Sequence, residues 1–397
     1  MTELTSKKWD IAIIGGGIIG SSIAYFLART GKSGRVAVIE RDPTYSKAST
    51  PLANGGIRRL FSLPENIIMA EFGLDFFSSF ASTMAINEEE QPISFCRQGY
   101  LFLSDNGDHS VMETNYEIQF ANGVDADLID AVELKKRYPS INTADIAIAV
   151  HSANDGWVDP QAALSAFKRK AVSLGVTYLN ECITNWDSGK GVARRAVTES
   201  GKIIEADTFV ISSGAWSGEV GRMIGLYLPV QPMARENYFF KTRALIEPLP
   251  LLKSETNLAF RPEGTGYTGG MPDWAVQYGW RSDLSANYFE RVVWPALAHR
   301  IPAFESLKLN GSFVGHYDTN SFDKSAIIGR WTGTGSEVCS NVFIASGFSG
   351  HGIMHAPATG LALSELILDG SYKTMDLSAF GYHRISLDRP YKETGII

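Results

Sequence analysis

Apolar and polar positions near the N-terminus follow the two periods that distinguish strands from helices. Residues 10–15, DIAIIG, form a short β-branched run that ends in glycine, and residues 18–30 carry apolar side chains at helical spacing. A second apolar run, RVAVIE, occupies residues 35–40. The order strand, tight turn, helix and strand predicts a βαβ unit with parallel pairing and a right-handed crossover.

Patterns of both kinds continue along the whole chain. Residues 177–200 contain short pieces that we expect to pair antiparallel before the next buried strand. Helices are predicted over residues 65–82, 160–175 and 358–370, and further strands over 99–104, 208–213 and 342–346. The resulting fold class is α/β (α+β), with two interleaved domains. We place a nucleotide-binding domain at residues 1–85, 150–232 and 318–397, and a β-sheet substrate domain at residues 86–149 and 233–317.

Composition narrows the range of functions. The 397 residues carry a net charge of −7 and no run of basic residues, which disfavours nucleic acid as a partner. Cys96, Cys182 and Cys339 show no metal-ligand spacing, so we expect neither a disulfide framework nor a metal site. No apolar stretch of about 18 residues occurs and the N-terminal residues contain no apolar leader, so we expect no membrane span and a cytoplasmic location.

The turn after the first predicted strand carries the strongest chemical signal. Gly15, Gly17 and Gly20 fit the pattern GxGxxG, which allows a tight turn, close approach of a pyrophosphate and close packing of helix on strand. Ile18 then begins the helix, whose N-terminus faces the phosphates. Glu40 stands 20 positions after Gly20, where a carboxylate accepts hydrogen bonds from a ribose.

The residue after Glu40 bears on which dinucleotide is bound. Arg41 would suit the extra phosphate of NADP, but the neighbouring Glu40 carboxylate would repel it. An unphosphorylated ribose is therefore favoured, which leaves FAD and NAD as alternatives.

Longer motifs spread over the chain resemble those of the FAD-dependent D-amino-acid oxidase superfamily, and within it the sarcosine oxidase-like amine oxidoreductases. They are IAIIGGGIIGSSIAYFLA with VIERD, ANGGIRRLFS, GWVDPQAALSAF, DTFVISSGAWSGEVG, GHYDTNSFDKSAIIG and NVFIASGFSGHGIMHAPATGLALSELILDG. The second and fifth motifs most resemble those of one branch of this superfamily, which contains a mitochondrial flavoprotein involved in respiratory complex assembly.

This resemblance implies a fold like that of p-hydroxybenzoate hydroxylase and glutathione reductase, with a Rossmann-like FAD-binding domain and a β-sheet substrate domain over the flavin. It also implies that the loop at residues 347–352 lies at the pyrimidine edge of the flavin, where backbone N–H groups and a helix N-terminus stabilise negative charge. By the same resemblance, residues from four further places in the chain contact FAD. The cofactor residues implied by resemblance are Ala53, Asn54, Gly55, Ile183, Ser213, Gly214, Trp216, Gly347, Phe348, Ser349, Gly350, His351 and Gly352.

Three departures from the family pattern matter for function. Gly315 stands where covalently flavinylated relatives have a cysteine, so we expect noncovalent FAD. Phe61 and Met354 stand where relatives have the arginine and lysine that hold the substrate carboxylate. The lysine linked with oxygen activation falls near Thr268, so transfer of electrons to an acceptor other than oxygen is as much expected as oxidase activity.

Five residues are candidates for the substrate site. Arg58 is expected in an active-site or flavin role, with a structural ion pair as the alternative, and Arg59 is expected to be structural. Arg261 could replace the carboxylate clamp or form a salt bridge. His351 and His355 have a spacing that could suit a metal, but without a third ligand we expect His351 to hydrogen-bond near the flavin. Met354, His316 and the neighbouring Tyr317 are expected to line the pocket.

The function predicted from these features is oxidation of the C–N bond of a secondary amine or N-substituted amino acid by hydride transfer to FAD, giving an imine that hydrolyses. Oxygen or another electron acceptor would receive the electrons. The alternatives are a subunit of a hetero-oligomeric amine dehydrogenase and a non-catalytic, flavin-stabilised assembly protein. The sequence leaves the oligomeric state open.

Overall fold

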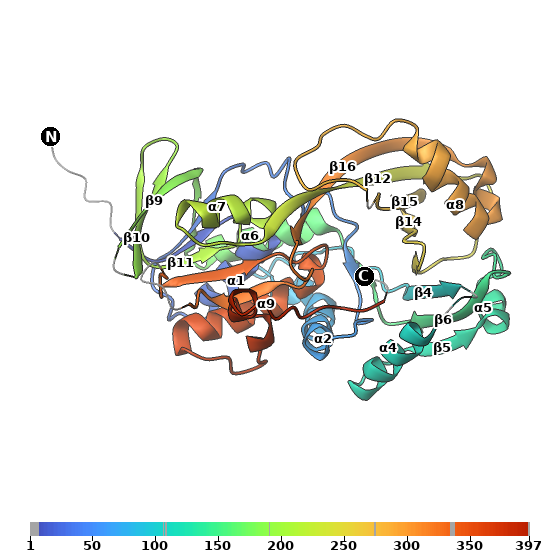
Figure 1. Ribbon diagram of the computed structural model, residues 1–397, viewed down its shortest axis with the longest axis horizontal. Helices are drawn as coiled ribbons and strands as arrows, with labels where there is room; N and C mark the ends of the chain where they lie inside the picture. The colour runs from blue at the N-terminus through green and yellow to red at the C-terminus, as the bar shows by residue number, and fades with distance from the viewer. Residues whose placement is uncertain are drawn as a thin grey trace.

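The computed structural model of the chain describes residues 8–105, 107, 109–189, 191–273, 275–333 and 338–395. In this part of the chain, two large sheets of eight strands each lie toward opposite ends of the long axis, and the C-terminal segment lies between them (Figure 1). The α/β fold class with two multistranded sheets is confirmed.

The first sheet has a parallel centre built from the predicted βαβ unit. β1 pairs in parallel with β2 on one side and with β11 on the other, and its residues Ile11–Ile14 are buried. The order along the sheet is β17 (Ile327–Arg330), β18 (Val342–Ser346), β11 (Ile203–Ile211), β1 (Trp9–Ile14), β2 (Val36–Glu40) and β8 (Thr177–Asn180), with β10 (Val192–Thr198) and β9 (Ile183–Gly189) attached to β11.

Pairing at the edge of this sheet differs from one expectation. β9 and β10 are antiparallel as predicted, but β8 pairs in parallel with β2, with Thr177 opposite Ala37. The reason is topological: β8 follows helix α6 (Pro160–Ser173), which crosses back over the sheet, and such a crossover returns the chain in the parallel direction.

Small residues let the helices on this sheet pack closely. In α1 (Ile18–Arg29), Ser22 donates its hydroxyl to the carbonyl of Ala356 in α9 (Gly352–Asp369) at 2.8 Å. A Cβ at Gly360 would come within 2.4 Å of the Ser22 hydroxyl, and one at Gly73 in α2 (Pro64–Ser78) within 2.1 Å of the Met354 carbonyl oxygen. These close contacts fix the direction of α9, whose N-terminus reaches the candidate site.

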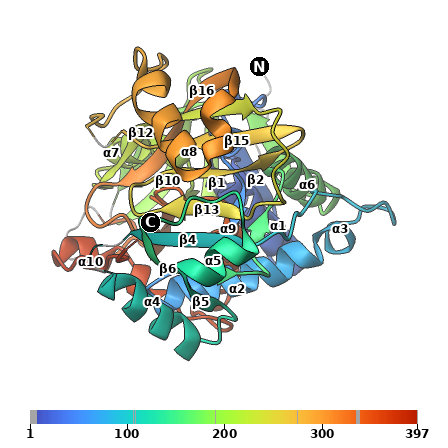
Figure 2. The ribbon, with the colours of Figure 1, turned by 90° about the vertical axis from the view of Figure 1, so that its right-hand side faces the viewer.

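The second sheet is mainly antiparallel and uses its two faces differently. Its outer face packs Leu101, Leu252 and Phe260 against helices α5 (Ala131–Arg137) and α8 (Trp294–Arg300), which lie in front of the sheet in Figure 2. The order is β16 (Lys308–Asn320), β12 (Val230–Lys241), β15 (Gly266–Gly270), β14 (Ala259–Glu263), β13 (Leu251–Ser254), β4 (Tyr100–Asp105), β6 (Ile146–Ser152) and β5 (Asp127–Asp130).

Two short strands and several α-helices lie outside the two large sheets. β3 (Gly56–Ile57) pairs with β7 (Gly156–Trp157), and the further α-helices of the described residues are α3 (Phe80–Thr83), α4 (Ser110–Ala121), α7 (Ser217–Met223) and α10 (His383–Ser386). β6, β12 and β16 cross the domain boundaries expected from the sequence, at residues 149/150, 232/233 and 317/318. The exact boundaries stay a prediction.

The C-terminal segment ties the two halves together. The Glu393 carboxylate accepts hydrogen bonds from the backbone N–H of Ser62 at 2.6 Å and from the side-chain amide of Asn66 at 2.6 Å, at the N-terminus of α2. The Thr394 hydroxyl donates to the side-chain oxygen of Asn115 in α4 at 3.1 Å. No described helix is long and apolar enough to cross a membrane.

Candidate cofactor and substrate site

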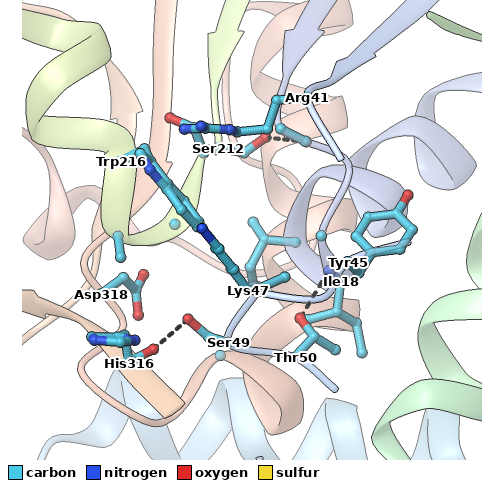
Figure 3. Close-up of a pocket in the computed structure, with 18 of the residues that line it drawn as sticks. Ile18, Arg41, Tyr45, Lys47, Ser49, Thr50, Ser212, Trp216, His316 and Asp318 are labelled. Carbon is cyan, nitrogen blue, oxygen red and sulfur yellow. Dashed lines mark hydrogen bonds between the residues drawn. The ribbon is translucent and has the colours of Figure 1, made fainter. Parts of the chain in front are cut away.

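A cavity of about 400 Å³ lies where the carboxyl ends of β1, β2, β11 and β18 meet β16. In open parallel sheets, ligands bind at this edge. In Figure 3, His316 and Asp318 stand on one side of the cavity, where the hydroxyl of Ser49 donates to the His316 carbonyl at 2.5 Å. On the other side, the backbone N–H of Ile18 at the start of α1 donates to the Thr50 hydroxyl at 3.3 Å.

The three glycines of the first turn have different structural roles. Gly15 has a φ of +97°, and a Cβ there would stand 2.6 Å from the Ser212 carbonyl oxygen. A Cβ at Gly20 would stand 1.9 Å from the Gly15 carbonyl oxygen. At Gly17 the nearest atom is the Thr50 hydroxyl at 3.8 Å, so the space beside the start of α1 is open. Gly15 and Gly20 are therefore required by packing, and Gly17 leaves room for a phosphate.

Glu40, the last residue of β2, is hydrogen-bonded to the glycine loop. One of its carboxylate oxygens accepts the N–H of Gly16 at 2.8 Å, and the other accepts the N–H of Asp42 at 2.8 Å. Burial raises the pKa of Glu40, and these two donors partly offset the rise. Each oxygen keeps a second lone pair for a ribose hydroxyl.

Two helix N-termini face the same cavity. α1 begins after Gly17 and α9 begins after His351; neither has a capping side chain or an acidic residue in its first turn. Gly350, Gly352 and Ile353 at the start of α9 line the cavity. The positive end of each helix is thus available to a ligand with negative charge at two separated places, as a dinucleotide has.

The loop at residues 347–352 is hydrogen-bonded to a carboxylate that was not predicted, that of Asp318 in β16. The Asp318 carboxylate accepts the backbone N–H groups of Gly347 at 2.9 Å and of Phe348 at 3.1 Å. Burial raises the pKa of Asp318 to about 6 although these donors lower it. The first two N–H groups of the loop therefore bind this carboxylate, and the start of α9 supplies the positive potential instead.

Arg58 lies beside the N-terminus of α9 and is only 2% exposed. Its guanidinium donates to the Leu60 carbonyl and, at 3.0 Å, to Nε2 of His351. The rings of Phe61 and Phe102 lie 4.0 and 5.1 Å from the guanidinium carbon. Burial, followed by the charge of Arg58, holds the pKa of His351 well below its usual value. His351 is therefore neutral and acts as an acceptor for Arg58.

Neighbouring Arg59 has a different environment. It contacts the carboxylates of Asp155, Glu71 and Asp125. No carboxylate among the described residues forms an ion pair with Arg58, so the structural ion pair considered for Arg58 is not found there. Arg59 has the structural role expected of it.

Two further cations approach Arg58 from the second sheet. Lys253 lies opposite Phe102 in the ladder between β13 and β4. Burial, then the charges of Arg58 and Arg235, hold the pKa of Lys253 well below its usual value. Arg235 in β12 lines the cavity, and its guanidinium carbon lies 4.9 Å from the centre of the Tyr317 ring. Arg235 in the lining and Arg58 behind it therefore give this end of the cavity a positive charge.

Most of the residues predicted to bind cofactor line this cavity. Arg41 does so with its guanidinium 4.9 Å from the Trp216 ring. The lining residues that were predicted are Gly15, Gly17, Ile18, Glu40, Arg41, Ala53, Ile183, Ser213, Gly214, Trp216, His316, Tyr317, Phe348, Gly350 and Gly352. Gly315 also lines it, which supports noncovalent attachment of a cofactor.

Other predicted residues lie behind the lining. Arg261 donates to the Asn54 carbonyl at 2.7 Å and contacts Glu263, which favours a structural role over a clamp. Met354 belongs to the apolar core, with 4% exposure. Gly20, Asn54, Gly55, Gly347, Ser349, His351, Arg58, Arg261 and Met354 are outside the set that lines the cavity. His355 is buried, and among the described residues no group of metal ligands is found around the two histidines.

Sequence reasoning did not find several residues of the site. Tyr45, Lys47, Thr50 and Arg235 line the cavity, and Asp318 caps the loop. Apart from Asp318, which lies in the motif GHYDTNSFDKSAIIG, none of them belongs to a recognisable local pattern, and only the folded chain brings them together. The acidic residue directly after Tyr317 was the one available signal.

A cradle with two helix N-termini, a ribose-binding carboxylate and a covering sheet is suited to hold an extended dinucleotide along its length. The fold and cavity thus define a dinucleotide-binding protein of the two-sheet class. The family is shown by a sequence profile described as "FAD dependent oxidoreductase" (DAO), which matches residues 10–366. The chain belongs to this family, and its cofactor is FAD.

Individual relatives agree with this assignment. "FAD-dependent oxidoreductase domain-containing protein 1" of Xenopus laevis is 36% identical, over 100% of this chain and 86% of that protein. "Glycine oxidase" of Bacillus licheniformis is 27% identical, over 95% and 98%. Among solved structures, "L-proline dehydrogenase from P.horikoshii" has a TM-score of 0.86 and 26% identity, over 97% of this chain and 99% of that one. The predicted family, with its sarcosine oxidase-like relatives, is confirmed.

Proposed function

We propose that this FAD-dependent oxidoreductase oxidises the C–N bond of a secondary amine or N-substituted amino acid, giving an imine that hydrolyses. The observation that carries the proposal is the buried guanidinium of Arg58 beside the N-terminus of α9, together with Arg235 in the cavity lining. FAD, when bound, supplies the hydride acceptor. The chain supplies positive potential where reduction adds negative charge, and cations for a substrate carboxylate.

The relatives support a substrate of this class. The solved structure with a TM-score of 0.86 is named for L-proline, a cyclic secondary amine with a carboxylate, and another relative is named for sarcosine, an N-methylated amino acid. Phe61 replaces the expected arginine by an apolar ring, so a carboxylate would bind to cations from other elements. We infer that Arg235 in β12 orients that carboxylate, helped by Lys253 in β13, which β15 and β14 separate from β12 in the second sheet.

The described residues near Arg58 do not include a strong base. His351 accepts from Arg58, and burial followed by the charge of Arg58 lowers the pKa of His355 to about 3. The amine must therefore bind or react as its free base, because only that form has the lone pair that assists hydride departure. The rate of flavin reduction should rise with pH through the pKa of the bound amine.

The experiment is anaerobic mixing of the FAD-loaded protein with sarcosine, N-methylalanine, L-proline and a secondary amine without a carboxylate. Loss of the visible flavin band by any of them supports the proposal. Lys253→Met should weaken apparent binding of the carboxylate-bearing amines and leave that of the uncharged analogue unchanged. Persistent oxidised flavin over the whole panel would contradict amine oxidation and favour the flavin-stabilised assembly protein.

The electron acceptor is tested in the same samples. Admission of oxygen after reduction separates an oxidase, which reoxidises rapidly, from a dehydrogenase that needs another acceptor. Copurification of partner chains would indicate the hetero-oligomeric alternative.

A further inference from the structure

A second cavity, of about 290 Å³, lies between α4, β4 and the C-terminal segment. Its floor is buried and mostly apolar, formed by side chains such as Phe61, Phe102 and Val150. Its lining also includes the exposed residues Val111 and Thr394, which place the mouth at the surface. The cavity shares no described lining residue with the FAD cavity.

Gln119 is the buried polar group of this second cavity. It is 3% exposed, and its side-chain N–H donates to the Phe61 carbonyl at 3.2 Å. The amide oxygen has no hydrogen-bond partner. A buried acceptor without a partner is destabilising, so this oxygen favours a ligand that brings a donor.

Glu255 is the only charged side chain among the described residues that line this cavity. Its carboxylate accepts the hydroxyl of Ser104 at 2.7 Å and the backbone N–H of Asp105 at 3.2 Å. Both partners are uncharged, and no cation among the described residues forms an ion pair with Glu255. The carboxylate therefore keeps unused lone pairs for a ligand.

The chemistry of the lining selects the ligand. Two groups of the lining, the Gln119 amide oxygen and the Glu255 carboxylate, are acceptors, one of them anionic, and they lie beside the apolar and aromatic side chains of the floor; the lining also contains the polar residues Asn115, Ser254, Asn257 and Thr394. An ammonium group on a compact apolar body satisfies both conditions, because its N–H donors match the acceptors and its charge matches the carboxylate. A carboxylate ligand would be repelled by Glu255.

We propose that this second cavity is a binding site for a small organic ammonium compound, held by Gln119 and Glu255 over the rings of Phe61 and Phe102. The same two rings pack on Arg58, so the bound compound is one aromatic layer away from the electropositive group beside the FAD cavity. The ligand could be an amine substrate before it reaches the flavin or a separate effector. The proposal goes beyond the proposed function, since binding here requires no turnover.

The test is isothermal titration of the FAD-loaded protein with isoamylammonium, and with isoamyl alcohol and isocaproate as isosteric neutral and anionic probes. We expect isoamylammonium to bind most tightly. Glu255→Gln should weaken its binding about tenfold or more, the loss expected for one charged hydrogen bond, and leave the alcohol unaffected. Gln119→Glu, which adds a carboxylate, should tighten it. Glu290→Gln, at an exposed residue outside the cavity lining, is the matched control and should change nothing.

Equal binding of the three probes, absence of isoamylammonium binding, or binding insensitive to both cavity variants would overturn the proposal. Anaerobic flavin reduction distinguishes the two sources of the ligand. If the ligand is a substrate on its way to the flavin, Glu255→Gln raises the apparent dissociation constant of the reducing amine and leaves the limiting rate of flavin reduction unchanged. If the ligand is an effector, the dissociation constant and the limiting rate both stay as in the unmodified protein. If no amine reduces the flavin, the titration still decides whether the site exists, so its failure is separable from that of the proposed function.

Discussion

The adjacent arginines 58 and 59 should respond in opposite ways to the same substitution. Arg59→Met removes the partner of Asp155, whose side chain has 0% exposure, and leaves that carboxylate buried without its cation. Breaking a buried ion pair in this way costs about 3–5 kcal/mol of unfolding free energy. The variant should fold less stably but keep the chemistry of any FAD-loaded fraction.

Arg58→Met has compensating effects on stability. It removes hydrogen bonds to the Leu60 carbonyl and to His351, at about 1–3 kcal/mol each. It also removes a buried cation that has no ion-pair partner among the described residues, and relief of that desolvation is worth several kcal/mol. The methionine side chain packs between Phe61 and Phe102 in its place. We expect an unfolding free energy close to that of the unmodified protein.

The rate of flavin reduction should be affected by the substitution of Arg58 rather than by that of Arg59. Loss of one preorganised positive donor beside a developing negative charge typically slows a reaction about 100-fold to 1,000-fold. Arg58→Met should therefore slow anaerobic flavin reduction by this factor at full FAD loading. The assays are urea unfolding followed by circular dichroism, and stopped-flow flavin absorbance. The reasoning is wrong if Arg58→Met loses as much stability as Arg59→Met, or if it reduces the flavin at the unmodified rate.

Three further predictions concern the FAD cavity. Gly20→Ala should lower the unfolding temperature, because its Cβ would stand 1.9 Å from the Gly15 carbonyl oxygen. The Cβ of Gly17→Ala would stand 3.8 Å from its nearest atom, the Thr50 hydroxyl, so this variant should fold normally but bind FAD more weakly in equilibrium dialysis. Equal FAD affinity of Gly17→Ala and the unmodified protein would exclude phosphate approach at this residue. Glu40→Gln should weaken FAD binding about tenfold through loss of a charged hydrogen bond to the ribose, and it should also lower the stability of the unloaded protein, because an amide nitrogen cannot accept the backbone N–H of Gly16 or Asp42. Asp318 has a folded pKa of about 6, raised from 3.8, so its contribution to stability is fully present below pH 3.8 and is lost as the pH rises through about 6. Asp318→Asn should remove that decline from urea unfolding of the unloaded protein; an unchanged pH profile would show that Asp318 does not titrate there.

Local patterns predicted most of the first sheet, and the exceptions have physical causes. The helix expected to begin at residue 358 begins at Gly352. Pro357 lies inside α9, although proline ends many helices. Packing of α9 on α1 and α2 compensates for the missing N–H. The helix expected over residues 65–82 is interrupted at Ser79 and continues as α3. β8 pairs in parallel because a crossover helix precedes it, and no pattern within residues 177–180 carries that information.

The sequence by itself determined the βαβ unit, the glycine loop with Glu40, and the family, because these depend on residues close together or on motifs of fixed spacing. Only the tertiary structure decided which cations surround the inner end of the cavity. Arg58 follows β3, Arg235 lies in β12 and Lys253 lies in β13, and long-range packing alone sets their separation. The same holds for Asp318 at the loop before α9 and for the cavity lined by Gln119 and Glu255. The positions of the charged groups in these sites are therefore set by contacts between segments distant in sequence. Burial removes water from each group, so its energy depends on the partners that those contacts supply.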